Sequence, residues 1–220
     1  MTLAELLERH SDDFVPMFDP PLNRNNTIAI DLSTANREFD GMDNFEWDHA
    51  IEEKIATAGA VAAVGGYLEK RSVYENTPTF ENEADRNVHI GVDIFIPTGT
   101  AIHAPLAGEI YCLANRQEVG DYGPVIILRH QLDGECFHSL YGHLTEASLQ
   151  GLQIGQSISA GTKIAEVGDR PRNGDWPPHL HFQLINDLQG LGDNYPGVAR
   201  DVDLDFYREN CPDPHRLVVA

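Results

Sequence analysis

Cysteine, positive charge and long apolar runs are all scarce in this sequence. Its three cysteines, Cys112, Cys136 and Cys211, lie far apart and form no C-x-x-C pair. This spacing argues against a disulfide framework, a redox motif and a zinc knuckle. The 220 residues include 35 acidic and 15 basic side chains, which gives a net charge of -20. Such a charge repels polyanions, so we expect neither nucleic acid nor an anionic membrane surface as a partner.

Segments that would place the chain in or across a membrane are also missing from the sequence. No window approaches the ~18 apolar residues of a membrane-spanning helix. The opening residues, MTLAELLERHSDDF, alternate charged and apolar side chains and lack the apolar region of a secretory signal. We therefore expect a soluble, cytoplasmic protein whose length allows a sizeable buried core.

The first 80 residues differ in pattern from the rest of the chain. TLAELLERH predicts a short helix with Thr2 as its N-cap, and NTIAIDLS predicts a strand. DNFEWDHAIEEKIATAGAVAAV has helical periodicity and predicts a helix that ends at Gly65 and Gly66. We interpret residues 1–80 as an α-rich N-terminal extension.

From residue 81 onward, short β-branched runs alternate with Gly, Pro and Asp turns. VHIGVDIFIP, PVIILRH and HLHFQLI are examples. This spacing is typical of an antiparallel β core with many short strands. We expect a mostly β, sandwich-like core over residues 81–187, α+β overall, and a C-terminal tail over residues 188–220 that wraps the core.

Two histidines one residue apart lie in the apolar stretch WPPHLHFQL. In a strand His179 and His181 share one face, while Leu180 and Phe182 hold the opposite face on the core. The α-carbons of the two histidines would lie ~6.6 Å apart. A lone histidine of this kind is more often a core or surface residue, but two on one face favour a metal site.

A second pair of candidate ligands lies in HIGVDIFIP, where alternation places His89, Gly91 and Asp93 on one face. A straight strand would separate the α-carbons of His89 and Asp93 by about 13 Å, which is too far for shared metal bonds of ~2 Å. We expect Gly91 to permit a bend or bulge that draws the two together. SLYGHL adds His143, which taken alone is more often a turn histidine.

These segments together offer two histidines and one carboxylate as ligands, with further imidazoles nearby. Such a donor set leaves a coordination position for water, as in hydrolytic zinc sites. The remaining histidines could transfer a proton or stabilise an oxyanion.

The motifs HIGVD, GTAIHAPLAGEI, YGHL, GQSISAGTKIAEVG and PPHLHFQL occur in the order found in the M23 metallopeptidases, which include lysostaphin-like and LytM-type cell-wall endopeptidases. Residues 87–184 resemble this family. The resemblance implies a zinc-dependent hydrolase, an endopeptidase or amidase, that cleaves a peptide or amide bond with a metal-bound water. It also implies roles for five residues: zinc ligands His89, Asp93 and His181, and an unliganded catalytic pair, His143 and His179.

Family members commonly hydrolyse peptidoglycan cross-bridges and are usually exported. Because this sequence shows no export signal, we expect an intracellular peptide or amide substrate, with a peptidoglycan-like peptide as the alternative. VGDRPRNGDWPPHLHFQ and the closing CPDPHRLV are similar to the M23-like segment of large fusion proteins that also carry kinase-like and class III aminotransferase domains. We further expect the acidic N-terminal segment to cover the groove and limit access.

Three other functions share parts of this pattern. A phosphocarrier of related topology contains an HFGID-like strand, but it needs a second histidine shortly before that strand, and none occurs between His49 and His89. Two histidines and a carboxylate also form the facial triad of non-haem iron oxygenases. An intact metal site can, finally, serve a non-catalytic binding module.

Overall fold

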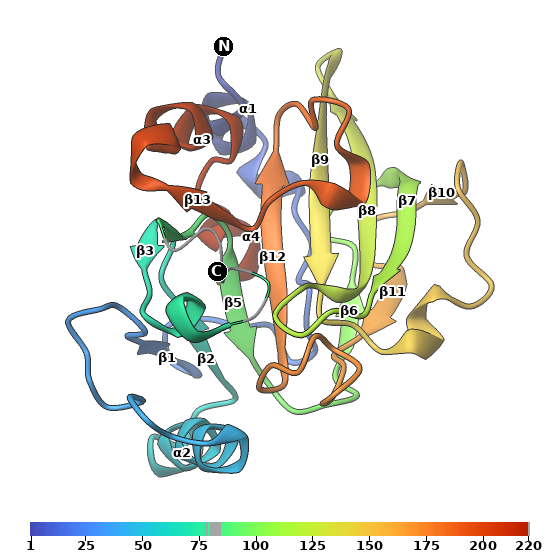
Figure 1. Cartoon of the computed structure of the whole chain (residues 1–220). Coiled ribbons are helices and arrows are strands. Elements are labelled where there is room, and N and C mark those ends of the chain that lie inside the picture. Colours follow the sequence, from blue (N-terminus) through green and yellow to red (C-terminus); the bar gives the residue numbers. More distant parts are fainter. Residues whose placement is uncertain (78, 80–84, 220) are drawn as a thin grey trace.

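The computed structural model describes residues 1–77, 79 and 85–219 (Figure 1). The α-helices are α1 (Leu3–Arg9), α2 (Asn44–Thr57), α3 (Leu204–Asn210) and α4 (His215–Val218). Short 3-10 helices are η1 (Ser11–Asp13), η2 (Val73–Asn76), η4 (Glu146–Leu149), η5 (Gly192–Asn194) and η6 (Asp201–Asp203). The strands are β1 (Thr27–Ile30), β2 (Ala62–Gly65), β3 (Glu69–Lys70), β4 (Arg86–His89), β5 (Val92–Phe95), β6 (Ala101–His103), β7 (Gly108–Arg116), β8 (Gly123–Leu132), β9 (Glu135–Gly142), β10 (Ser157–Ile158), β11 (Lys163–Glu166), β12 (His179–Ile185) and β13 (Val198–Arg200).

One large sheet organises the molecule, with its strands in the order β1-β2-β5-β12-β9-β8-β7-β10. Neighbouring strands run antiparallel, except for the parallel pair β1 and β2. Strand β12 lies between β5 and β9 near the middle of the sheet (Figure 1). The predicted mostly β fold with antiparallel pairing is confirmed.

Strand β12 is buried along its whole length and separates two apolar clusters. Leu180 and Phe182 belong to the larger cluster, which also contains apolar residues of α1. Ile185 belongs to a second cluster on the opposite side of the sheet. Alternation along the strand therefore places His179 and His181 on the face away from the main core, as predicted.

The predicted N-terminal helix forms, and Thr2 is its N-cap. The Thr2 hydroxyl accepts a hydrogen bond from the Glu5 backbone N–H, and the Glu5 carboxylate accepts one from the Thr2 backbone N–H. This reciprocal pair satisfies two donors that a helix start leaves open.

The predicted helix up to Gly65 is wrong in its last third. Helix α2 ends at Thr57, and the left-handed Gly59 (φ +62°) follows. Ala62 and Ala63 are fully buried in β2, which pairs with β1 on one side and β5 on the other. Sheet pairing therefore overrides the helical propensity of these alanines.

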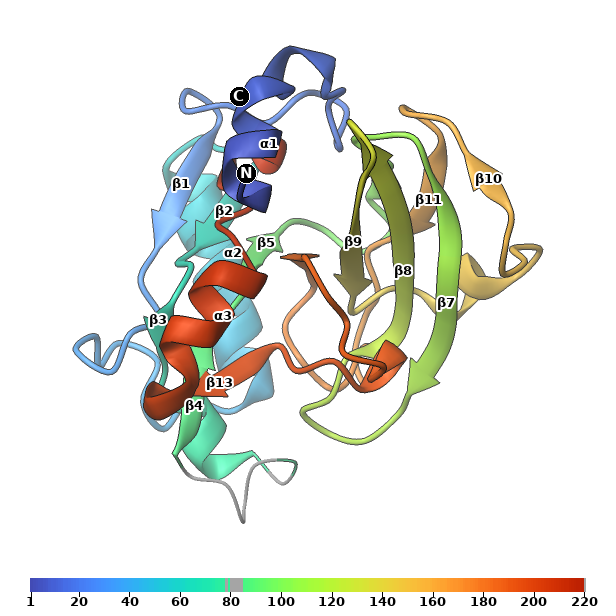
Figure 2. The same cartoon turned by 90° about the horizontal axis from the view of Figure 1, so that it is seen from above.

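The strand predicted over HIGVDIFIP is interrupted around Gly91, as expected: β4 ends at His89 and β5 begins at Val92. Strand β4 leaves the large sheet and pairs with β3 and β13, which lie beside it in Figure 2. Strand β5 stays in the large sheet beside β12. The ligand candidates His89 and Asp93 therefore come from two different sheets.

The division of the chain at residues 80 and 187 stays a prediction. In the structure, β1 and β2 extend the large sheet, and Val198 in β13 lies opposite His89 in β4. Both flanking segments therefore contact strands that surround the candidate ligands. No helix in the described part of the chain is long and apolar enough to cross a membrane.

Substituting Phe182 by Ala should destabilise the fold without removing a candidate ligand. Phe182 is fully buried on the core face of β12, and losing a buried phenylalanine typically costs about 3–5 kcal/mol. Urea unfolding of metal-free protein measures this loss. Phe206→Ala is the control, because Phe206 is 43% exposed and should change stability by less than about 0.5 kcal/mol. Similar losses for both variants would contradict the assignment of faces.

Candidate metal centre

Strand register brings the predicted site residues together. Across the antiparallel pair β5 and β12, His181 lies directly opposite Asp93. On its other side His181 lies opposite Gly142 in β9, the residue before His143. Directly opposed residues have β-carbons ~4.5–5.5 Å apart. The pairing of the strands therefore places the side chains of His181 and Asp93 next to each other.

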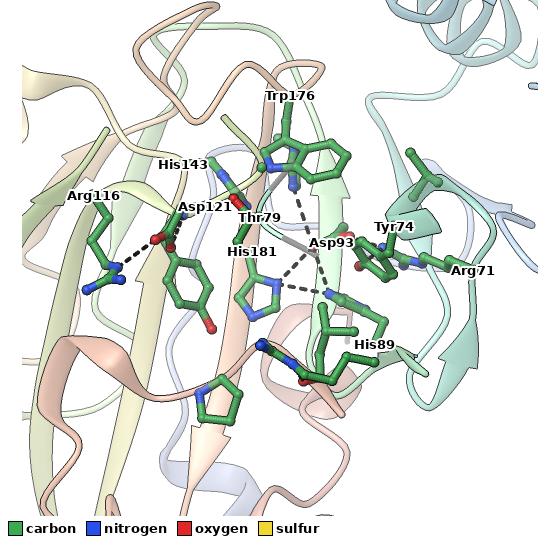
Figure 3. A pocket seen from close by; sticks show the side chains of 18 of the residues that line it. Arg71, Tyr74, Thr79, His89, Asp93, Arg116, Asp121, His143, Trp176 and His181 are labelled. Carbon is green, nitrogen blue, oxygen red and sulfur yellow. Dashed lines mark hydrogen bonds and ion pairs between the residues drawn. The ribbon is translucent and has the colours of Figure 1, made fainter. Parts of the chain in front are cut away.

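Three candidate ligand atoms meet at short distances (Figure 3). His89 Nε2 lies 2.9 Å from His181 Nδ1 and 3.2 Å from Asp93 Oδ1, and His181 Nδ1 lies 3.1 Å from Asp93 Oδ1. All three side chains are buried. Atoms spaced this closely can all lie about 2.0–2.1 Å from one ion, the usual bond length of zinc to histidine and carboxylate.

Hydrogen bonds on the far side of each ring determine which nitrogen carries the proton. His89 Nδ1 lies 3.3 Å from the Gly66 carbonyl oxygen and donates to it. His181 Nε2 lies 3.0 Å from Gln183 Oε1, and the amide nitrogen of Gln183 donates to the Pro196 carbonyl. Because these outward nitrogens hold the protons, His89 Nε2 and His181 Nδ1 present lone pairs to Asp93 Oδ1.

In these tautomers three acceptors converge on one buried point. Such an arrangement is electrostatically unfavourable unless a cation lies among them. The donor set of two imidazoles and one carboxylate matches that of catalytic zinc sites, which keep a further position open. The cluster His89, Asp93 and His181 could thus hold a metal ion.

The protonation states of His89 and Asp93 are those that metal ligands require. Burial, together with the charge of Arg71, lowers the pKa of His89 to about 3, so this ring is neutral at neutral pH. Burial alone would raise the pKa of Asp93, but the permanent charge of Arg71 helps to hold the pKa well below its usual range. Asp93 is therefore an anionic ligand.

His143 and His179 lie beside the ligand cluster, with ring centroids 4.3 Å apart. His143 Nδ1 donates to the Asn173 carbonyl at 2.7 Å, and His179 Nδ1 donates to the Pro177 carbonyl at 2.6 Å. Each ring therefore keeps a lone pair on Nε2, and His179 Nε2 lies 3.6 Å from Asp93 Oδ1. Burial lowers the pKa of both histidines, so both are neutral and can accept a proton.

Gly91 is needed at this site for space. A β-carbon built on Gly91 would lie 2.7 Å from Cε1 and 2.8 Å from Nε2 of His181. Its φ is not in the left-handed region, so the conformational freedom expected of this glycine is not what the site uses. The H-x-G-x-D spacing leaves a gap that the His181 ring occupies.

Several residues that hold the site in place had no role in the sequence prediction. Gln183 is fully buried and orients His181. The side chain of Asn173 donates to the Trp176 carbonyl and accepts from the Trp176 N–H, which fixes the loop that carries the partner carbonyl of His143. Gly66 lies far from His89 in the sequence, so no local pattern could have identified it.

The site opens into a cavity of about 270 Å³ whose lining includes all five predicted residues. Trp47, Tyr74 and Trp176 form an aromatic wall of this cavity. The ring centroid of Trp176 lies 6.1 Å from the ring centroid of each of the other two. Trp47 and Tyr74 precede the first candidate ligand in the chain. Residues of the N-terminal segment therefore form part of the cavity wall, while the limitation of access stays a prediction.

Comparison with known proteins identifies the region that carries the site. Residues 87–192 match the model of peptidase family M23. A curated relative is the peptidoglycan DD-endopeptidase ShyA of Vibrio cholerae serotype O1, 29% identical over 97 residues. This alignment covers 44% of the chain but only 20% of ShyA. The similarity to fusion proteins with kinase-like and aminotransferase domains stays a prediction.

Two solved structures are also similar to part of the chain. The catalytic domain of lysostaphin from Staphylococcus simulans is 25% identical, with a TM-score of 0.39, over 56% of this chain and 80% of that domain. A zinc-containing peptidase from Vibrio cholerae is 24% identical, with a TM-score of 0.36, over 44% of this chain and 27% of that protein.

Substituting Gly91 by Ala should weaken zinc binding, because the new methyl group and the His181 ring cannot occupy the same space. We expect a loss of roughly 10- to 100-fold, as for other changes that displace a ligand, measured by competition with a chromophoric chelator. Gly151→Ala is the control: Gly151 has φ +79° but open space around it. Unchanged zinc affinity in Gly91→Ala would contradict the spatial role.

Proposed function

From the match of residues 87–192 to peptidase family M23, we propose that this protein is a zinc-dependent hydrolase that cleaves a peptide or amide bond. The observation that carries the proposal is the convergence of three candidate ligand atoms, one each from His89, Asp93 and His181. Beside them lie two neutral imidazoles, His143 and His179, that each offer a lone pair on Nε2.

The three ligands account for only part of the chemistry. When bound, zinc supplies a Lewis acid that polarises a carbonyl and makes a water molecule acidic enough to react at neutral pH. The protein holds the ligands in place through the Gly66 carbonyl and the Gln183 amide. Such partners of ligand imidazoles typically matter 10- to 100-fold for metal affinity or activity.

His143 and His179 are the groups that move protons in this proposal. Each has its Nδ1–H tied to a backbone carbonyl, so a proton can be accepted only at Nε2. One ring takes up a proton at Nε2 as general base. The other stabilises the negative charge that develops on the substrate oxygen, a role that requires a proton on its own Nε2, taken up from solvent before the reaction. The ring that has gained a proton can then donate it to the leaving nitrogen.

A peptide is the substrate class that the surroundings favour. The aromatic wall of Trp47, Tyr74 and Trp176 offers apolar surface beside the catalytic imidazoles, where a substrate side chain can be buried. The relative ShyA is named a peptidoglycan DD-endopeptidase, which supports a peptide bond as the target. The cytoplasmic location expected from the sequence stays a prediction, and with it an intracellular peptide.

Metal analysis followed by digestion of a peptide library tests the proposal. We expect stoichiometric zinc, cleavage that stops on addition of chelator, and recovery of cleavage on return of zinc. His181→Ala and Asp93→Ala should lose the metal, because each removes a ligand. His179→Ala should keep the metal and lose about 100- to 10,000-fold in turnover, the usual contribution of a general acid or base.

Two results would contradict the proposal. Full activity in His179→Ala would remove the role assigned to that ring. Bound iron(II) with turnover that requires oxygen would favour the oxygenase chemistry open to the same ligands.

A further inference from the structure

Arg71 reaches the candidate metal centre from outside the region that matches the peptidase family. It follows β3, and its backbone N–H donates to the Asn87 carbonyl at 2.8 Å, which places it beside β4. Its side chain is only 3% exposed. In Figure 3 the guanidinium approaches Asp93 from the side opposite to His181.

The two oxygens of Asp93 have different partners. Oδ1 faces the ligand nitrogens of His89 and His181. Oδ2 accepts a hydrogen bond from Arg71 Nη1 at 2.5 Å. With Oδ2 held in this way, the carboxylate presents one oxygen to the point where the ligands converge.

Burying the Arg71 guanidinium costs free energy, which suggests that its charge has a function at this site. Arg71 Nη2 is buried and has no hydrogen-bond partner among the residues that the structure describes, a loss that proteins normally avoid. A β-carbon on Gly65 would lie 2.9 Å from this nitrogen, so the glycine leaves the space that the group fills. The guanidinium also donates to Glu69 through Nε at 2.7 Å and to the Tyr74 hydroxyl through Nη1 at 3.3 Å.

A buried carboxylate needs a positive charge nearby. At Asp93 a bound metal ion or the Arg71 guanidinium can supply it, and only the guanidinium is always present. Asp93 is 5% exposed, and an uncompensated charge at such a position is strongly unfavourable. A metal ion can leave, whereas a guanidinium remains charged at all relevant pH values. Both cations would act on the same carboxylate and repel each other.

We propose that Arg71, through its contact with Asp93 Oδ2, is the counter-charge that keeps the site assembled when zinc is absent, and that it lowers the affinity for zinc in return. The proposal rests on the proposed function, since it assumes that zinc binds to Asp93. Arg71 is a positioning residue in this account, because it acts through Asp93 and contacts no substrate.

Arg71→Met tests the proposal, because methionine keeps much of the side-chain length and removes the charge. The melting temperature is measured for the chelator-treated and the zinc-loaded protein, and the dissociation constant for zinc by competition with a chromophoric chelator. Relative to the parent protein, the melting temperature of the metal-free variant should fall by on the order of 10 °C more than that of the zinc-loaded variant. The variant should bind zinc on the order of tenfold more tightly, because the competing cation is gone.

Arg116→Met is the matched control. Arg116 lines the same cavity and donates to Asp121 through Nε at 2.8 Å, but among the described residues it contacts none of the three candidate ligands. The melting temperatures of the metal-free and zinc-loaded forms of this variant should fall by the same amount, and its zinc affinity should match that of the parent.

Equal losses in the two forms of Arg71→Met, or zinc binding that is unchanged or weaker, would overturn the proposal. If Arg71→Met does not fold without metal, the pair Asp93→Asn and Asp93→Asn with Arg71→Met decides. Once the carboxylate is gone, removing Arg71 should cost clearly less stability than it does in the parent, and an equal cost would overturn the proposal. A parent that binds no zinc would instead refute the proposed function.

Discussion

The site depends on three acceptor atoms that face one another at 2.9–3.2 Å in a buried place. Two imidazole lone pairs and one carboxylate would repel at this distance if nothing positive lay between them. The surrounding structure nevertheless holds them there, through the Gly66 carbonyl behind His89 and the Gln183 amide behind His181. Positive charge would stabilise this arrangement: a metal ion at the point of convergence could supply it, and Arg71 supplies it permanently.

The neighbouring segments of the chain complete the site. The N-terminal segment contributes Gly66, Arg71 and part of the aromatic wall. The C-terminal segment lies behind Gln183, whose amide donates to the Pro196 carbonyl and to the sulfur of the buried Cys211. Residues 87–192 hold the five predicted site residues, but residues on both sides of this region set the orientation and charge of the ligands.

Local periodicity predicted much of this site, because strands impose it. His179 and His181 share a face of β12, and β12 spans the residues of the predicted HLHFQLI strand. The same alternation extends to Gln183, so its place behind His181 could have been recognised from the i, i+2 pattern. Arg71 and Gly66 had no such signal, because they reach the site only through pairing of distant strands. The error at Ala62 and Ala63 has the same origin, since their partners β1 and β5 were not visible in a local pattern.

The most direct test of a zinc ion at the convergence point is anomalous diffraction from crystals of the zinc-loaded protein, recorded on both sides of the zinc absorption edge. We predict one strong difference peak about 2.0–2.2 Å from each of His89 Nε2, Asp93 Oδ1 and His181 Nδ1. A peak bonded to other side chains, or no peak in crystals of protein that contains stoichiometric zinc, would contradict the account.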